Sequence, residues 1–235
     1  MSIRTLGTAT DVRPCVNCKP GHIALAASPE ASDNWAAEVS CAAFAAGTVL
    51  YARGSTSRHI FGICDGLVKL VMPVANGGQR IVRLAREGDV IGLEGLADNT
   101  YHSSASAITS VRSYVIPAQR IKRWDRDVPR FHEILLCLLL RGQDHADRII
   151  AELATGKAKA RMARLIFDFL AYENMGGACL CHAPSREDMA AILGVTTETA
   201  SRIIAGLKRQ RLIGSESSYC FPCKIDELKK LADGE

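Results

Sequence analysis

Short apolar runs separated by glycines fill the chain from about residue 38 to residue 118. The five clearest runs are Thr48–Tyr51, His59–Ile63, Leu67–Met72, Arg80–Leu84 and Val111–Ile116. Between two of them, Asn76-Gly77 suits a type I′ turn, whose two central residues need positive φ. Short strands at regular spacing with glycines between them predict an antiparallel β-roll.

After Pro117 the pattern becomes helical. Residues 129–154 contain no internal proline, and one set of positions alternates four and three apart: Phe131, Leu135, Leu138, Gly142, His145 and Ile149. This heptad-like seam is typical of a helix that pairs with a second copy of itself. The alternative is a helix packed on its own β-roll, and Gly142 and His145 weaken the second half of the seam. We favour pairing, which predicts a homodimer.

A second helix is predicted over Lys157–Tyr172, after a candidate hinge at Thr155-Gly156, and a short strand over Ala178–Ala183. The next segment reads SREDMAAILGVTTETASRIIAGLKRQRLI and begins at Ser185. Ser185 and Asp188 resemble a capping box that opens a short helix. Gly194 ends that helix.

Thr196 or Thr197 can cap a second helix in this segment. Its apolar face is Ala200, Ile203, Ile204 and Leu207. Two short helices joined at a glycine turn form a helix-turn-helix. The closing stretch LIGSESSYCFPCKI, from Leu212, suits the hairpin of a wing.

These patterns predict an α+β chain of four parts. They are an irregular N-terminal arm with cysteines (1–34), a β-roll or jelly roll (35–126), a long dimerisation helix (127–155) and a winged helix-turn-helix (156–235).

On the second helix of the motif, Glu198, Ser201 and Arg202 are spaced i, i+3, i+4 and therefore share one face. A recognition helix places such residues on base edges in the major groove. Arg can donate twice to guanine, and Glu can accept from cytosine. The alternative is a solvated helix face that carries a Glu198–Arg202 ion pair.

Two further side chains are candidates for the DNA backbone. Arg186, at the start of the first helix, is placed to meet a phosphate, and Lys208 adds positive charge near the end of the second.

Composition narrows the class of protein. The 235 residues are 48% hydrophobic and 23% charged, with a net charge of +4, as in an ordinary globular protein. The longest strongly apolar stretch, Ile134 to Leu140, is too short for a membrane span of roughly 20 residues. The first residues contain no apolar core of a secretory signal, so we expect a cytoplasmic protein with no membrane partner.

Nine cysteines are the unusual feature of the composition. In a protein without export signals they favour metal or redox chemistry over structural disulfides. Cys41, Cys64 and Cys137 lie in or beside apolar runs, and we expect burial for each. Cys15 and Cys18 have mostly polar neighbours and indicate a thiol switch or a metal site. Four more, Cys179, Cys181, Cys220 and Cys223, are expected to lie close together in the winged domain, as a structural zinc site, a redox disulfide or simple packing.

The order of elements and several motifs resemble the CRP/FNR family of bacterial transcription regulators. The motifs are GTVLYARG, FGICDGLVKLV, GDVIGLEGL, AKARMARLIFDFL and, most specifically, SREDMAAILGVTTETASRIIAGLKRQRLI. The resemblance implies a homodimeric, non-enzymatic DNA-binding regulator with RNA polymerase as a further partner. It also implies that the β-roll (35–126) is a sensor domain of the cyclic-nucleotide-binding type.

The recognition helix matches the E-x-x-S-R pattern of the FNR-like branch, because Thr197 rather than Arg precedes Glu198 and Ser201 is present. The resemblance implies that Glu198, Ser201 and Arg202 read a palindrome similar to TTGAT-N4-ATCAA, with Thr197 tuning the first base pairs.

The resemblance also bears on the signal. FNR-like sensors hold a [4Fe–4S] cluster on three N-terminal cysteines and a fourth in the roll. Here Cys15 and Cys18 lie where the N-terminal group would be, and Tyr114 stands at the position of the fourth ligand. Cys41 is the nearest substitute for a missing ligand, and the other candidates are Cys64, Cys137 and His22. We expect a response to oxygen, nitric oxide or redox state through Cys15, Cys18 and Cys41.

Alternatives for the signal remain open. They are a thiol switch without a cofactor, zinc, and a small molecule or haem in the roll with His102 or His145 as ligand. Cyclic-nucleotide binding in this family uses a Gly-Glu pair and a later Arg followed by Ser or Thr. Here Leu93 follows Gly92 and no Arg stands beside Ser103, so cyclic AMP is disfavoured. A cupin-type metal enzyme that uses His102 and Glu94 is the remote alternative from another class.

Overall fold

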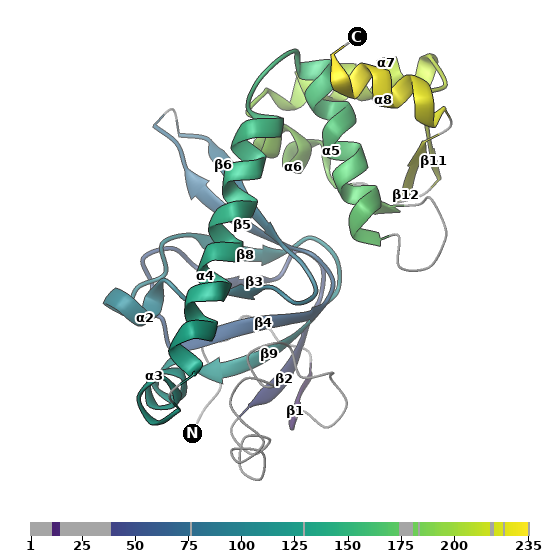
Figure 1. The fold of residues 1–235 in the computed structure, drawn as a ribbon. Coiled ribbons are helices and arrows are strands. Elements are labelled where there is room, and N and C mark those ends of the chain that lie inside the picture. The colour runs from purple at the N-terminus through teal and green to yellow at the C-terminus, as the bar shows by residue number, and fades with distance from the viewer. Residues whose placement is uncertain are drawn as a thin grey trace. The chain divides into compact units, whose positions relative to one another are not determined.

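The computed structural model describes residues 11–14, 39–75, 77–128, 130–173, 181–182, 184–216, 219–222 and 224–234 (Figure 1). The chain divides into two compact units. The first comprises Met1–Pro73 and Val82–His145, and the second comprises Val74–Ile81 and Ala146–Glu235.

Two antiparallel sheets form the β-roll. The five-stranded sheet has the order β1 (Asp11–Pro14), β2 (Ser40–Phe44), β9 (Val111–Pro117), β4 (His59–Asp65) and β7 (Val90–Ile91). The four-stranded sheet has the order β3 (Val49–Tyr51), β8 (Ser104–Ala107), β5 (Val68–Pro73) and β6 (Gln79–Ala85). The five predicted strands and the hairpin between β5 and β6 are confirmed; Asn76 of its turn lies outside the described residues.

Alternating side chains of both sheets meet in one apolar core. Its aromatic members are Phe44, Tyr51, Phe61 and Tyr101. Burial on one face of each strand is what fixes the register of such sheets, because a slip by one residue would turn the whole apolar set toward water.

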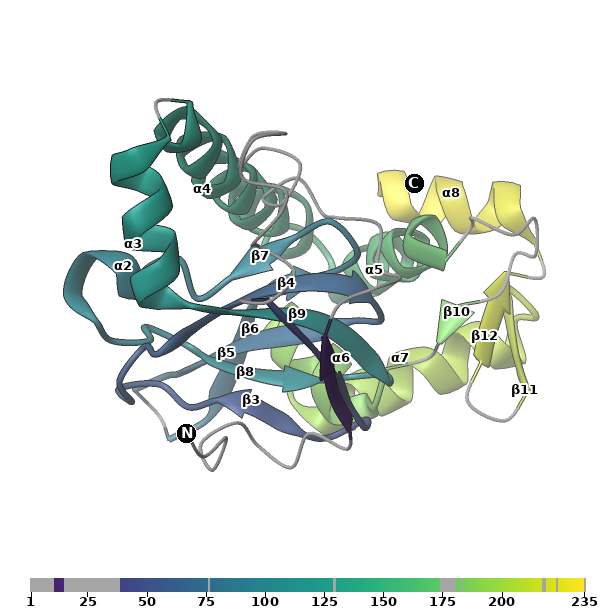
Figure 2. The ribbon, with the colours of Figure 1, turned by 90° about the horizontal axis from the view of Figure 1, so that it is seen from below.

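Two helices cover the outer face of the five-stranded sheet (Figure 2). They are α3 (Ala118–Asp127) and α4 (Phe131–Arg148). Trp124 of α3 meets Phe131 of α4 edge to face, with ring centroids 5.7 Å apart. Both pack into a second apolar cluster with Tyr114 and Ile116 of β9. A one-turn helix, α2 (Gly95–Asp98), lies between β7 and β8.

The seam of α4 was predicted to pair with a second copy, but it is buried within this chain and is not a free face. Phe131, Leu135 and Leu138 belong to the cluster on the outer face of the roll. A Cβ built on Gly142 would lie 2.7 Å from the guanidinium of Arg83, so this position is also covered within the unit. The predicted helix is confirmed, but these residues pack on the chain's own roll, which was the alternative considered above. Heptad spacing alone does not distinguish a roll surface from a second helix.

After the end of α4, the second unit contains a π-helix, η3 (Ile149–Leu153), and α5 (Ala158–Glu173). The helix-turn-helix follows as α6 (Arg186–Leu193) and α7 (Thr197–Arg209). A three-stranded sheet of β10 (Cys181–His182), β12 (Tyr219–Pro222) and β11 (Ile213–Glu216) forms the wing, and α8 (Ile225–Asp233) ends the chain. The motif and the wing hairpin are confirmed.

Two arginines of α5 hold the ends of neighbouring helices together. Arg161 donates to the carbonyl oxygens of Leu153 at 3.2 Å and Leu193 at 2.6 Å. Arg164 donates to the carbonyl oxygens of Glu152 at 2.9 Å and Ala232 at 2.6 Å. Helix C-termini leave carbonyl groups without partners inside the helix, and these guanidinium groups satisfy four of them.

Three elements depart from the sequence prediction. Strand β1 lies within the arm that was predicted to be irregular, because the edge of β2 offers backbone groups for pairing. Helices α3 and α8 were not predicted. No helix among the described residues is both long and apolar enough to cross a membrane.

Candidate functional site

The recognition helix α7 starts at a well-formed cap. Thr196 adopts an extended backbone, and its hydroxyl accepts a hydrogen bond from the Thr199 amide at 3.1 Å. Such a cap satisfies one of the orphan N–H groups of the first turn. The turn before it uses Gly194 with φ of 64°, and Ser185 caps α6 in the same way through the Asp188 amide. The motif therefore has both of its helix starts fixed by side chains.

The predicted base-reading residues lie on the outward face of α7. Thr197, Glu198 and Arg202 are exposed and Ser201 is half-buried. The opposite face is buried through Ala200, Ile204 and Leu207, whereas Ile203 is half-buried. The described part of the chain shows no ion pair between Glu198 and Arg202, so both charged groups can meet a partner from outside.

Positive side chains flank this face. Arg186 stands half-exposed in the first turn of α6, and Lys208 and Arg209 are exposed in the last turn of α7. Arg211 follows in the left-handed conformation, with φ of 54°. These cations surround the outward face and suit the phosphates on either side of a major groove.

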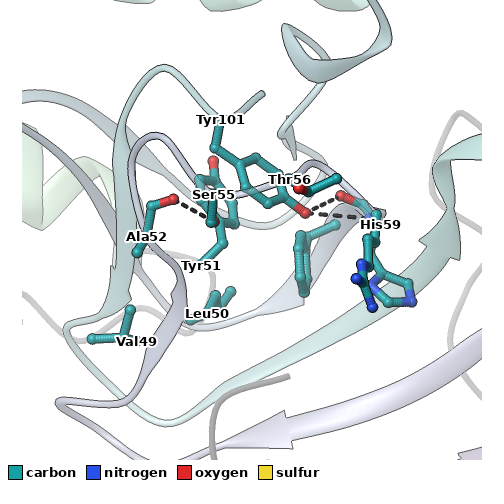
Figure 3. A pocket seen from close by; sticks show the side chains of 10 residues that line it. Val49, Leu50, Tyr51, Ala52, Ser55, Thr56, His59 and Tyr101 are labelled. Carbon is teal, nitrogen blue, oxygen red and sulfur yellow. Dashed lines mark hydrogen bonds between the residues drawn. The ribbon is translucent and has the colours of Figure 1, made fainter. Parts of the chain in front are cut away.

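The β-roll contains a cavity of about 490 Å³. It is lined by ten residues, namely Val49, Leu50, Tyr51, Ala52, Ser55, Thr56, Arg58, His59, Phe61 and Tyr101. Figure 3 shows Tyr101 over Tyr51, with its hydroxyl aimed at the backbone of His59. The two tyrosine rings stack with centroids 3.9 Å apart at 13°. The Tyr101 hydroxyl donates to the His59 carbonyl oxygen at 2.6 Å.

Burial changes the ionisation of the cavity's side chains. It raises the pKa of Tyr51 well above its ordinary value, and the negative charge of Glu94 adds to the effect. Burial also raises the pKa of Tyr101 and, together with the positive charge of Arg58, lowers the pKa of His59. The cavity therefore presents neutral tyrosines and a neutral imidazole at pH 7, with Arg58 as its cation.

The ring of Tyr101 packs beside Gly92, which begins the segment 92–94 that the family resemblance associates with cyclic-nucleotide binding. Gly92 has φ of 86°, and a Cβ on it would lie 3.1 Å from a ring carbon of Tyr101. Leu93 is buried, and the Glu94 charge acts on both tyrosines. Tyr101 thus takes up the space beside Gly92.

Cys41 lies on β2 of the five-stranded sheet, next to a position that the resemblance assigns to a cluster ligand. It is directly opposite Tyr114 of β9, the position assigned above to the fourth cluster ligand, and opposite Arg13 of β1. Cys41 is half-buried against the apolar cluster under α3 and α4. Strand β1 ends at Pro14, and Cys15 follows it in the sequence. Cys15 and Cys18 lie outside the described residues.

The remaining described cysteines divide between the units. Cys64 is half-buried, as Cys41 is, whereas Cys137 is exposed on α4, so its predicted burial is wrong. In the wing, Cys181 and Cys220 are direct register partners. Cys179 and Cys223 lie outside the described residues.

The candidate haem and cupin ligands do not gather at the cavity. His102 is exposed and bonded to Asp98 at 2.7 Å, and His145 lies half-buried on α4. Neither lines the cavity, and neither does Glu94. Among the residues described, no group of three or more His, Cys, Asp and Glu side chains could hold a metal ion.

Comparison with known proteins decides the family. The model of the cyclic nucleotide-binding domain matches residues 42–124, and that of the Crp-like helix-turn-helix domain matches residues 160–233. This chain belongs to the CRP/FNR family of transcription regulators. Its relatives in the CRP/FNR family are transcriptional regulators without enzymatic activity. This confirms the prediction of a non-enzymatic regulator and removes the alternative of a cupin-type metal enzyme.

Relatives match most of the chain. The nitrogen fixation regulation protein FixK of Rhizobium meliloti is 27% identical over 173 residues, 73% of this chain and 77% of FixK. The transcriptional activator protein anr of Pseudomonas aeruginosa is 24% identical over 192 residues, 80% of this chain and 79% of anr. The solved structure of a CRP/FNR transcriptional regulator from Thermus thermophilus is 27% identical, with a TM-score of 0.67, and the match covers 83% of this chain and 98% of that one.

Two structural features of this CRP/FNR regulator are not predicted by its sequence. The stacked Tyr51–Tyr101 pair joins β3 to the loop between α2 and β8, and no periodicity links two such distant positions. The exposed leucines of α4 lie in the run LLCLLL, but the heptad spacing favours the neighbouring face of the helix as the pairing seam.

Proposed function

We propose that this protein is a homodimeric, DNA-binding transcription regulator that recognises an FNR-like palindrome and responds to oxygen, nitric oxide or redox state through cysteines. The observation that carries the DNA-reading part is the outward face of α7. There Glu198 and Arg202 are exposed without an ion pair between them, on a helix whose start is capped by Thr196.

The geometry supports direct reading of bases. Arg202 has two parallel donors for guanine O6 and N7, Glu198 can accept from cytosine N4, and Ser201 can donate or accept. Arg186 and Lys208 meet phosphates on either side, which sets the position of the helix without reading sequence. In a two-fold dimer the second copy of α7 reads the other half of the palindrome.

An exposed apolar patch on α4 supports the dimer. Leu136, Leu139 and Leu140 are 47%, 48% and 57% exposed, on the side of the helix away from the roll. A monomer gains nothing from a leucine cluster in water, and burial against a second copy contributes roughly 25 cal/mol for each Å² of apolar surface removed. The proposed dimer interface is therefore this patch.

Cys41 supports the sensing part of the proposal. It lies directly across from Tyr114, so its Cβ is about 5 Å from the Cβ at the position where the family has a roll thiolate. Strand β1 pairs with β2 as far as Pro14, the residue that precedes Cys15 in the sequence. Cys15, Cys18 and Cys41 would hold an iron–sulfur cluster through three thiolates, one fewer than the usual set, and a bound cluster would supply reactivity toward oxygen and nitric oxide.

The experiment is purification without oxygen, followed by analysis of iron, sulfide and zinc and a visible spectrum, on the full chain and on C41S. A cluster predicts iron and sulfide together, a broad absorption that bleaches in air, and loss of both in C41S. C137S, which changes an exposed thiol on α4, is the matched control and should keep the spectrum. Zinc alone, or no metal with air-sensitive DNA binding, would replace the cluster by a zinc site or a thiol switch.

The cavity of the roll favours a second candidate, the same regulator controlled by a small organic ligand. About 490 Å³ with an aromatic wall and one cation, Arg58, suits a small aromatic acid. Under this alternative, DNA affinity would depend on the ligand and not on air. Haem would give a sharp Soret band, which the same spectrum tests.

A further inference from the structure

Two cysteines are register partners on neighbouring strands of the wing sheet. In the antiparallel pair β10–β12, Cys181 is the register partner of Cys220, next to the pair His182 and Tyr219. No other two cysteines of the described residues are register partners. Neither residue has a part in the proposed base reading or in the proposed sensor on Cys41.

The spacing of opposed residues in such a sheet suits a disulfide. Directly opposite residues have Cα atoms about 4.5 or 5.5 Å apart, depending on whether the pair is hydrogen-bonded. A disulfide spans Cα separations of about 4.4–6.8 Å. Either type of pair therefore brings the two backbones close enough to be joined without moving a strand, and register partners stand on the same face of the sheet.

The place of the pair in the fold gives the bond a consequence. Cys181 stands four positions before Ser185, the cap of α6, and Cys220 stands in the central strand of the wing sheet. A bond between them would close a loop that contains α6, α7 and β11. The chain between the two cysteines is the part of the molecule that would contact DNA.

We infer that Cys181 and Cys220 form a reversible redox pair that closes this loop around the helix-turn-helix. With hydrogen peroxide as oxidant, one thiolate sulfur attacks a peroxide oxygen, the O–O bond breaks, and a sulfenic acid and hydroxide form. The second thiolate attacks that sulfur, the S–O bond breaks, and hydroxide leaves as the disulfide forms. Two thiols lose two electrons and two protons, peroxide gains them, and two waters result. A small thiol reverses the reaction by exchange.

Peptide mapping of the full-length protein tests the pair directly. Trypsin should release residues 165–186, with Cys179 and Cys181, and residues 212–224, with Cys220 and Cys223. After peroxide treatment and alkylation, the wild type should give these two peptides linked, and reduction should release them. The double variant C179S/C223S should keep the link. C181S/C223S, which leaves Cys179 and Cys220, should lose it.

Stability supplies a second measurement that does not depend on DNA binding. In the C179S/C223S background the melting temperature should rise by several degrees on oxidation, because the closed loop restricts the unfolded chain. In C181S/C223S it should not change. A link that persists in C181S/C223S, thiols that resist peroxide because each chain carries one zinc, or alkylated free thiols throughout would each overturn the inference. None of these outcomes bears on whether α7 reads an operator.

Discussion

Leu138 and Leu139 are consecutive residues of α4 with opposite surroundings. Leu138 is 4% exposed in the apolar cluster under the helix, whereas Leu139 is 48% exposed on its outer side. One helix thus carries two apolar faces, one for its own roll and one free. The two faces can be separated by mutation, because a change on either should leave the other intact.

Leu140→Glu should dissociate the dimer. It is the most exposed leucine of the free face, and a carboxylate buried in a dimer interface costs several kcal/mol unless it is paired. Sedimentation equilibrium should show a shift from dimer to monomer, with an unchanged thermal midpoint at low concentration. Leu138→Ala is the matched change on the other face and should cost about 2–5 kcal/mol of roll stability without changing association at native temperatures. A dimeric L140E would refute this interface.

Arg202→Ala should weaken operator binding by about 1–3 kcal/mol and relax the preference at its base pair. Lys208→Ala should weaken binding to all sequences alike and reduce the salt slope by about one. Fluorescence anisotropy with the palindrome and with single-base variants, at two salt concentrations, distinguishes the two effects. Lys229→Ala on the exposed side of α8 is the control. Equal affinity of R202A and wild type would remove Arg202 from base reading.

Thr196→Ala should cost about 1 kcal/mol of stability, because the Thr199 amide loses the hydroxyl oxygen to which it donates a hydrogen bond. The first turn of α7 would fray there, next to Glu198, so operator affinity should fall as well. Thr196→Ser restores the hydroxyl and should rescue both properties. Chemical unfolding followed by circular dichroism, together with anisotropy, measures them. Failure of the serine variant to rescue would show that the methyl group, and not the cap, matters.

Acid should destabilise the β-roll through His59. Burial, with Arg58 second, lowers the pKa of His59 in the folded state. The unfolded chain, with a histidine pKa of about 6.5, then binds the proton more readily. The contribution of His59 to stability is therefore fully present above about pH 6.5 and is lost as pH falls below it toward the folded pKa.

Urea unfolding at pH 7.5 and pH 5.5 measures the His59 contribution. In a Trp35→Phe background, the emission of Trp124 reports on the roll and α3 alone. His59→Gln should reduce the loss of stability between the two pH values. The Tyr101 hydroxyl bonds to the backbone of His59, so that contact survives the change. An equal loss in H59Q and its parent would assign the pH dependence to other groups.

The sequence predicted the elements whose patterns are local. The strands of the roll, the cap at Ser185, the left-handed turn at Gly194 and the outward face of α7 all depend on residues close together in the chain. The cap and the turn need particular residue types, serine for a hydroxyl acceptor and glycine for positive φ, so they are visible in one dimension.

The features that were missed depend on the partner of a face. The apolar positions of α4 fit pairing with a second helix and packing on the chain's own roll equally well. Only the presence of Tyr114 and Trp124 in the same apolar cluster shows that they pack on the roll. The Tyr51–Tyr101 stack joins residues 50 positions apart, and the pairing of Cys41 with Tyr114 depends on a strand register that spans the whole roll. Helix α3 is too short and polar at its start for its periodicity to stand out after Pro117.

The two carbonyl bonds of Arg161 make the end of the long helix part of the DNA-binding unit. Arg161 donates to the carbonyl oxygens of both Leu153 and Leu193, and Arg164 donates to that of Glu152, so α5 ties η3 to the end of α6 through side chains as well as through the Thr155-Gly156 link. These contacts hold segments that lie far apart in the sequence as one body within the second unit.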